Sequence, residues 1–223
     1  MKTARQLYTE YKIMPSLQLH QLRVAAVGKL VCDNFTPPAG GAINTHDVTL
    51  ACLFHDMGNI IKSELSYFPE FLEPQGLVYW QGVKDEYVKK YGADHRAANT
   101  AIAQEIGLPQ GAYELFAGLG FSKLEKILLD ASSEQKICEY ADLRVGPHGV
   151  LPLIERLLEG RERYLETSKK RLHYASEDSF RKLSESAKKL EEQVLSNTSL
   201  APDDISDAAI QNSIEELQNY SVA

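Results

Sequence analysis

Two ionisable residues, His55 and Asp56, directly follow the apolar run from Leu50 to Phe54. An apolar context predicts burial, and a buried imidazole or carboxylate needs a hydrogen-bond partner, an ion-pair partner or a metal ion. A second such pair, His46-Asp47, stands where a helix is expected to begin, and the helix dipole favours an exposed acidic residue there. His55 and Asp56 are therefore the better candidates for chemistry.

Three further ionisable residues, His20, His95 and Asp142, also stand in apolar helical contexts. Each one alone is explained by an ordinary hydrogen bond or ion pair in a protein core. Together with His55 and Asp56, however, they would need a separate partner for each buried ionisable group. One divalent cation would satisfy four of the five residues at once: His20, His55, Asp56 and Asp142. This donor set suits Mn, Fe, Co, Ni or Zn better than Ca²⁺, and Mg²⁺ is a further candidate. The sequence thus predicts one divalent metal ion, with His95 as an additional candidate ligand.

The order and spacing of these residues resemble the HD-domain metal-dependent phosphohydrolase superfamily. Its signature is a His, then an adjacent His-Asp, then a distant Asp, each on a separate helix. The family pattern His-x-x-Arg-Val-Ala matches residues 20–25, and an apolar run into His-Asp-hydrophobic-Gly matches residues 51–58. The Ala-Asp pair of a later helix matches residues 141–142. The resemblance covers roughly residues 15–150.

The resemblance implies a hydrolase that acts on a phosphate ester or anhydride of a small molecule, above all a nucleotide. It would be a phosphomonoesterase or phosphodiesterase that uses a metal-activated water. Asp56 would serve both as a metal ligand and as the group that moves a proton. Arg23 and Arg144 are expected to reach into the cleft and hold phosphoryl oxygens, with Lys62 and Arg96 as weaker candidates.

The chain departs from the superfamily pattern at two places. Many two-metal members carry further histidines before the last Asp; His95 resembles the first, but residues 117–121, where the second would stand, contain none. After His-Asp-x-Gly, where relatives place a Lys or an acid, this chain has Asn59. Two alternatives to the hydrolase therefore stay open. One is a metal-dependent oxygenase on the same fold, and the other is a non-catalytic nucleotide-sensing HD module.

The elements that must position these residues are predicted to be helices. Apolar residues recur at helical spacing and no segment alternates as a strand, so we expect an all-α HD-domain bundle. Its helices are expected over residues 16–35, 45–57, 94–106, 111–119 and 133–145. The aromatic-rich segment 64–92, helical in its second part, is either an insertion with its own hydrophobic cluster or a wall that stacks a flat group.

The character of the chain changes after Pro152, where highly charged helices are expected. We therefore divide it into an HD-type helical domain, residues 1–152, and a C-terminal helical extension, residues 153–223. The extension should contain helices over 153–175, 177–196 and 203–219. Three arrangements of it are open: packing on the core, pairing with a second copy in a homodimer, and binding another partner.

Composition sets the outer limits on function. Of the 223 residues, 43% are hydrophobic and 25% charged, which is ordinary for a globular protein. A net charge of −7 argues against a nucleic-acid binder, so we expect a small-molecule phosphate substrate and no nucleic-acid duplex as partner. The three dispersed cysteines predict reduced core thiols, and neither a signal-peptide pattern nor a membrane-length apolar run occurs. These features predict a cytoplasmic protein with no membrane partner.

Overall fold

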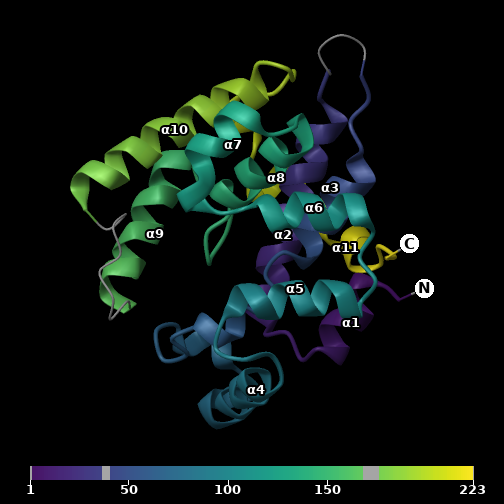
Figure 1. Ribbon diagram of the computed structural model, residues 1–223, viewed down its shortest axis with the longest axis vertical. Helices are drawn as coiled ribbons and strands as arrows, with labels where there is room; N and C mark the ends of the chain where they lie inside the picture. The colour runs from purple at the N-terminus through teal and green to yellow at the C-terminus, as the bar shows by residue number, and fades with distance from the viewer. Residues whose placement is uncertain (1, 37–40, 168–175, 223) are drawn as a thin grey trace.

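A computed structural model describes residues 2–36, 41–167 and 176–222 (Figure 1). The described residues form α-helices and short 3₁₀ turns, and they contain no β-strand beyond isolated bridges. The all-α prediction is therefore confirmed. The α-helices are α1 (Ala4–Glu10), α2 (Pro15–Asp33), α3 (Thr45–Phe54), α4 (Gly76–Tyr91), α5 (His95–Glu105), α6 (Gln110–Gly118), α7 (Leu124–Asp130), α8 (Ser133–Arg144), α9 (Leu153–Thr167), α10 (Glu177–Leu195) and α11 (Asp207–Gln218).

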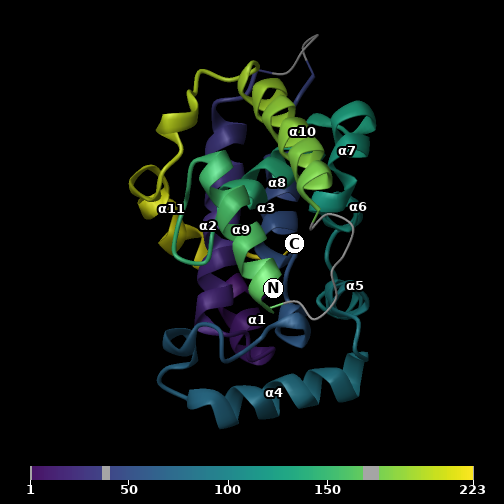
Figure 2. The same ribbon diagram turned by 90° about the vertical axis from the view of Figure 1, so that its left-hand side faces the viewer.

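Helices α2, α3 and α8 form the centre of the molecule (Figure 2). α2 packs against α3, α8 and α11, and α3 packs in turn against α6 and α8. Gly28 of α2 allows the closest approach, because a Cβ there would lie 3.3 Å from Cys52 Sγ and 3.3 Å from Val48 Cγ1. The facing side chains are buried and apolar, as the helical spacing predicts. These three helices carry or precede the residues that the sequence singled out.

The helix α3 is shorter than predicted, and its early end places His55 and Asp56 in a turn. It ends at Phe54, whereas the sequence predicted a helix that continues through His55 and Asp56 and ends before Gly58. The polar groups that would continue it find other partners: the Asp56 N–H donates to Gln21 Oε1, and the Gly58 N–H donates to Asn99 Oδ1. Because side chains from α2 and α5 take these backbone donors, the helix stops. The 3₁₀ turn η2 (Asn59–Lys62) follows.

The aromatic-rich segment divides into a loop and a helix. Its second part forms α4, which buries Trp80, Val83 and Tyr87 and packs against η2 and α5. Its first part holds the 3₁₀ turn η3 (Pro69–Leu72). Trp80 Nε1 donates to the Leu72 carbonyl at 3.1 Å, which fastens the loop to the helix.

The C-terminal helices pack on the rest of the protein. α9 contacts α8, α10 contacts α7 and α8, and α11 contacts α1 and α2. The described helices of the C-terminal extension therefore contact residues 1–152, although the composition of the chain changes after residue 152. Packing on the core is one of the three arrangements that the sequence left open. Residues 168–175 of the first charged helix lie outside the described residues. In the described part of the chain, no helix has the length and apolar character needed to cross a membrane.

Candidate metal centre

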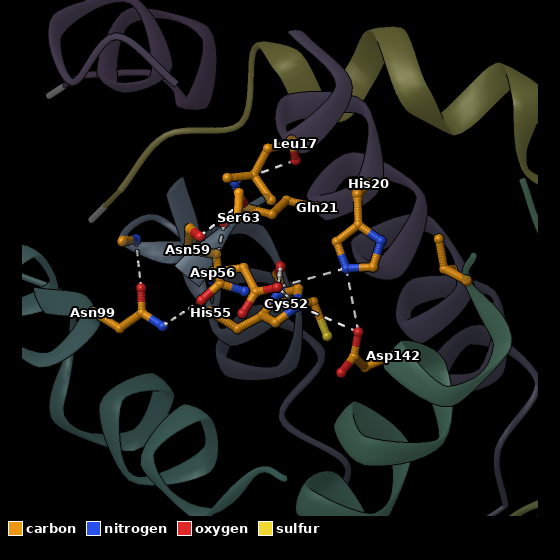
Figure 3. A network of polar contacts seen from close by, with 12 residues as sticks. Leu17, His20, Gln21, Cys52, His55, Asp56, Asn59, Ser63, Asn99 and Asp142 are labelled. Carbon is orange, nitrogen blue, oxygen red and sulfur yellow. Dashed lines mark hydrogen bonds and ion pairs between the residues drawn. The ribbon is translucent and has the colours of Figure 1, made fainter. Parts of the chain in front are cut away.

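Four of the predicted site residues meet between α2, the end of α3 and α8 (Figure 3). His20 Nε2 lies 3.3 Å from Asp142 Oδ1 and 3.8 Å from Asp56 Oδ2. His55 Nε2 lies 3.4 Å and 3.6 Å from the same two oxygens. Each imidazole nitrogen therefore faces both carboxylates, although the residues stand up to 122 positions apart (142 − 20 = 122).

The orientation of His55 fits a metal ligand. Its Nδ1 lies 2.7 Å from the Cys52 carbonyl, which can only accept a hydrogen bond, so Nδ1 carries the donated proton. Its Nε2 is completely buried and makes no well-aligned hydrogen bond within the described part of the chain; its nearest polar neighbours are the carboxylates of Asp142 and Asp56, at 3.4 and 3.6 Å. A divalent cation between this nitrogen and the two carboxylates would bind all three groups at once.

The spacing of the donor atoms also fits a single ion. Ligand atoms that lie about 2.1 Å from one ion in octahedral geometry are about 3.0 to 4.2 Å apart. The four imidazole-to-carboxylate distances fall within this range, between 3.3 and 3.8 Å. His20, His55 and Asp56 offer ligand atoms that all lie within 4.8 Å of one another. Asp142 Oδ1 lies close to both imidazoles but outside this group of three.

Burial and neighbouring charges shift the pKa values of these groups in opposite directions. Burial lowers the pKa of His55, but the carboxylates of Asp56 and Asp142 outweigh it and raise the pKa to about 10. Burial raises the pKa of Asp142, but contacts with His20 and His55 hold it well below its usual value. Burial likewise opposes ionisation of Asp56, and the charges of His55 and Lys62 lower its pKa. Two ionised carboxylates in a buried site attract positive charge.

His95 lies in the same cleft but outside this group of four. It begins α5, and its Nδ1 is 4.0 Å from Asp94 Oδ1. Burial and the charge of Lys62 lower the pKa of His95, which favours the neutral imidazole with a free lone pair. Its assignment as a further ligand stays a prediction.

Sequence reasoning missed the residues that hold the turn in place. Gln21 is fully buried on α2, and its Oε1 accepts from the Asp56 N–H at 3.2 Å. Asn99 of α5 accepts from the Gly58 N–H and donates to Asn59 Oδ1 at 3.4 Å. The signal was present: an amide side chain on an otherwise apolar helical face needs a partner.

A cleft of about 520 Å³ surrounds the candidate metal ligands. Five positive side chains from several elements line it, together with the carboxylates of Asp56, Glu64 and Asp142. These cations are Lys62, Arg96, Lys123, Arg156 and Arg163. Arg156 donates from Nε to the Val145 carbonyl, three residues beyond Asp142, so its guanidinium is held next to the end of α8. Because the cations outnumber the carboxylates of the lining, the electrostatic potential of the cleft favours an anion.

The structure corrects the predicted roles of Arg23 and Arg144. Arg144 is 2% exposed, and its guanidinium points away from the cleft to donate to the carbonyls of Leu151 and Ile205. Arg23 Nε pairs with Asp207 Oδ1 at 3.0 Å. Neither residue lines the cleft. Both arginines instead attach the C-terminal extension to the central helices.

Two of the three arginines that line the cleft, Arg156 and Arg163, come from α9, in the charged extension, and the third, Arg96, comes from α5. Arg156 and Arg163 both pair with Glu159 of the same helix.

The chain matches no protein-family model, no curated protein and no solved structure. The chemistry of the cleft is therefore inferred from its own residues: donors for a divalent cation, a local excess of positive charge, and an apolar side.

Proposed function

We propose that the chain is a metal-dependent phosphohydrolase that cleaves a phosphate ester or anhydride of a small molecule. One observation carries the proposal: a two-histidine, two-carboxylate group shares a cleft with five lysine and arginine side chains in an acidic chain. Donors for a divalent cation beside a cationic wall suit phosphoryl transfer, where catalysis is mostly positioning and charge stabilisation. The motif resemblance to HD-domain phosphohydrolases supports the same reaction.

The side chains of the candidate ligands are already oriented for binding a metal ion. His20, His55, Asp56 and Asp142 would hold the ion, with the Cys52 carbonyl keeping His55 in its binding orientation. A divalent cation bound there would polarise a phosphoryl oxygen and lower the pKa of a water molecule. Asp56, ionised because His55 and Lys62 lower its pKa against the effect of burial, is able to accept a proton.

The cationic side chains would bind the phosphate. Lys62 and Arg96 make no ion pair with any residue in the described part of the chain, so their charges are available to a ligand. Arg156 and Arg163 are held near the cleft by Glu159 and can turn their remaining N–H groups toward an anion. These residues would take the role that the sequence had given to Arg23 and Arg144.

The test is metal-dependent release of phosphate. The full chain is stripped with chelator, reloaded separately with Mn²⁺, Fe²⁺, Co²⁺, Ni²⁺, Zn²⁺ or Mg²⁺, and incubated with nucleotides and simple phosphoesters. Turnover that chelator abolishes and that Asp56→Asn lacks supports the proposal. Asp33→Asn, at the exposed end of α2, is the matched control and should keep full activity. Failure to release phosphate from any substrate with any metal would overturn it.

One observation favours the nucleotide-sensing module as a second candidate. Asn59 is 4% exposed and stands where relatives of the superfamily carry a Lys or an acid. A primary amide neither donates nor accepts a proton in catalysis. Tight binding of metal and a nucleotide without turnover would identify the module.

A further inference from the structure

Asn59 is a buried amide in the wall of the cleft, and none of the candidate metal ligands uses it. It begins η2, three residues after Asp56, and only 4% of it is exposed. It is also one of the residues that line the cleft. A primary amide carries two N–H donors and one carbonyl acceptor, and a buried polar group without a partner costs about 1 to 3 kcal/mol. The hydrogen bonds of Asn59 therefore decide which of its groups is free to bind a ligand.

Two hydrogen bonds fix the orientation of the Asn59 amide (Figure 3). The Gly58 N–H can only donate, so the Asn99 atom that it meets is Oδ1, and the other atom of that amide is Nδ2. Asn99 Nδ2 donates in turn to Asn59 across 3.4 Å, and only Oδ1 of Asn59 is able to accept. The Nδ2 atom of Asn59 is therefore on the side of its amide that does not face Asn99.

The Nδ2 atom of Asn59 has its two N–H donors free. It makes no hydrogen bond within residues 2–36, 41–167 and 176–222, and it is not fully enclosed by protein. Because the residue lines the cleft, these donors open into the cleft. An amide nitrogen does not ligate a metal ion, so its N–H groups suit an oxygen atom of a bound ligand.

The turn after α3 places these donors between a candidate metal ligand and a cation. The Asn59 N–H donates to the Asp56 carbonyl at 3.0 Å, and η2 continues from Asn59 to Lys62. Side chains three residues apart in a 3₁₀ turn lie on the same side, and Asp56, Asn59 and Lys62 all line the cleft. The Ser63 hydroxyl donates to the Asn59 carbonyl at 3.0 Å and so holds the end of the turn. An anion attracted by a metal ion at Asp56 and by Lys62 would meet the Asn59 amide.

We propose that Asn59 donates from Nδ2 to a phosphoryl oxygen of the bound ligand, which makes it a substrate-binding residue of the cleft. The phosphate itself rests on the proposed function, whereas the free donor follows from the hydrogen-bond pattern. A metal ion and an ammonium group attract an anion with little directional preference, but an N–H group binds an acceptor only near its own axis. Asn59 therefore orients the phosphoryl group, and this role requires no proton transfer from the amide.

Two substitutions isolate the donor, because loss of the N–H groups is the one change that they share. Asn59→Leu is similar in size and adds no charge, but it removes the acceptor for Asn99. Asn59→Asp keeps an acceptor for Asn99 but adds a negative charge. Calorimetry on the full chain measures the Kd of orthophosphate, both in chelator and with saturating Mn²⁺. We expect both variants to bind orthophosphate at least about tenfold more weakly, as the loss of a hydrogen bond to a charged group predicts.

Two controls separate the loss of the donor from a disturbed turn. Asn212→Asp, on an exposed part of α11 outside the cleft, adds the same charge and should keep orthophosphate affinity within about twofold. The Mn²⁺ affinity of Asn59→Leu should also stay within about twofold, because Asp56 keeps its N–H bond to Gln21. Melting temperatures of all variants show whether the fold is retained.

The outcomes distinguish this inference from the proposed function. Unchanged orthophosphate affinity in either Asn59 variant, or a parallel loss of Mn²⁺ affinity in Asn59→Leu, would overturn the donor, while phosphate release by the wild type would still support the hydrolase. The expected losses in a chain that releases no phosphate from any substrate would support the donor and overturn the hydrolase. A wild type that binds no orthophosphate in either condition would overturn the donor.

Discussion

The Nδ1 atom of His55 donates to the carbonyl of Cys52, three residues earlier, across 2.7 Å. This bond fixes the ring so that Nε2 faces Asp56 and Asp142. The same carbonyl would otherwise accept a backbone N–H near the end of α3. The helix therefore gives up regular hydrogen bonding at the point where the candidate site begins, and the imidazole is oriented by the backbone that carries it.

Replacement of His55 tests the ligand assignment directly. His55→Ala removes one of four donors, and we expect metal affinity to fall by about a hundredfold or more. His46→Ala is the matched control, because His46 belongs to the other His-Asp pair and contacts Tyr220 at the surface. Metal content after dialysis, measured by elemental analysis, should drop for the first variant only. Equal metal content in both variants would contradict the assignment.

Metal affinity should depend on pH with a definite sign. The proton on His55, whose pKa is raised to about 10 by the nearby carboxylates against the effect of burial, must leave before Nε2 can bind an ion. Below pH 10 each unit of rising pH should therefore tighten apparent binding by about tenfold for one released proton. Competition with a metal-sensitive dye between pH 6 and pH 9 measures the slope. An affinity that does not change over this range would show that metal binding displaces no proton from His55.

The four candidate metal ligands could be predicted from the sequence, because each is an ionisable residue in an apolar helical context. The cationic wall could be predicted only in part: Lys62 and Arg96 were expected near the phosphate, whereas the two cleft arginines of α9 were not. Arg144 stands two residues after Asp142, and residues two apart on a helix point in nearly opposite directions, so it was directed away from the cleft. Arg156 lies on a helix with the alternating charges of a solvated surface, and only its packing on α8 brings it to the site.

Arg144 and Arg156 should therefore behave differently when replaced. Arg144→Ala leaves the buried carbonyls of Leu151 and Ile205 without a donor, and we expect a loss of about 3 to 5 kcal/mol in unfolding free energy. Arg156→Ala should change stability less and reduce phosphate release, because it removes a cation from the cleft. Urea unfolding and phosphate-release assays on both variants check the contrast. The reverse pattern would restore Arg144 as the phosphate-binding residue.

Replacement of Gly58 tests how closely the turn after α3 must approach α5. A Cβ at this position would lie 2.7 Å from Ala98 Cβ and 3.0 Å from the Asn99 backbone nitrogen. Gly58→Ala should therefore cost about 1 to 3 kcal/mol and displace the adjacent Asp56, lowering metal affinity as well. Gly82→Ala, inside α4 with nothing within 4 Å, is the control and should be neutral or stabilising. Equal effects of the two substitutions, by urea unfolding and metal binding, would show that the close approach does not constrain the site.

Glu139 should make the stability of the protein fall as pH rises from about 4.5 to about 7. Burial on α8 raises the pKa of Glu139 to about 7, although the Gly120 N–H donates to its Oε2 at 2.8 Å. The folded state therefore keeps a proton that the unfolded state loses near pH 4.5, so stability declines between these two values and then levels off. The size of this decline is up to about 3 kcal/mol.

Glu139→Gln isolates this contribution, because the amide cannot titrate and all other groups are unchanged. In urea unfolding with chelator present, the variant should match the wild type near pH 4.5 and exceed its stability at pH 8. The difference between the two curves should grow between pH 5 and pH 7, where the buried carboxyl loses its proton. A constant difference across this range would mean that Glu139 is already ionised in the folded protein, with the Gly120 N–H outweighing burial.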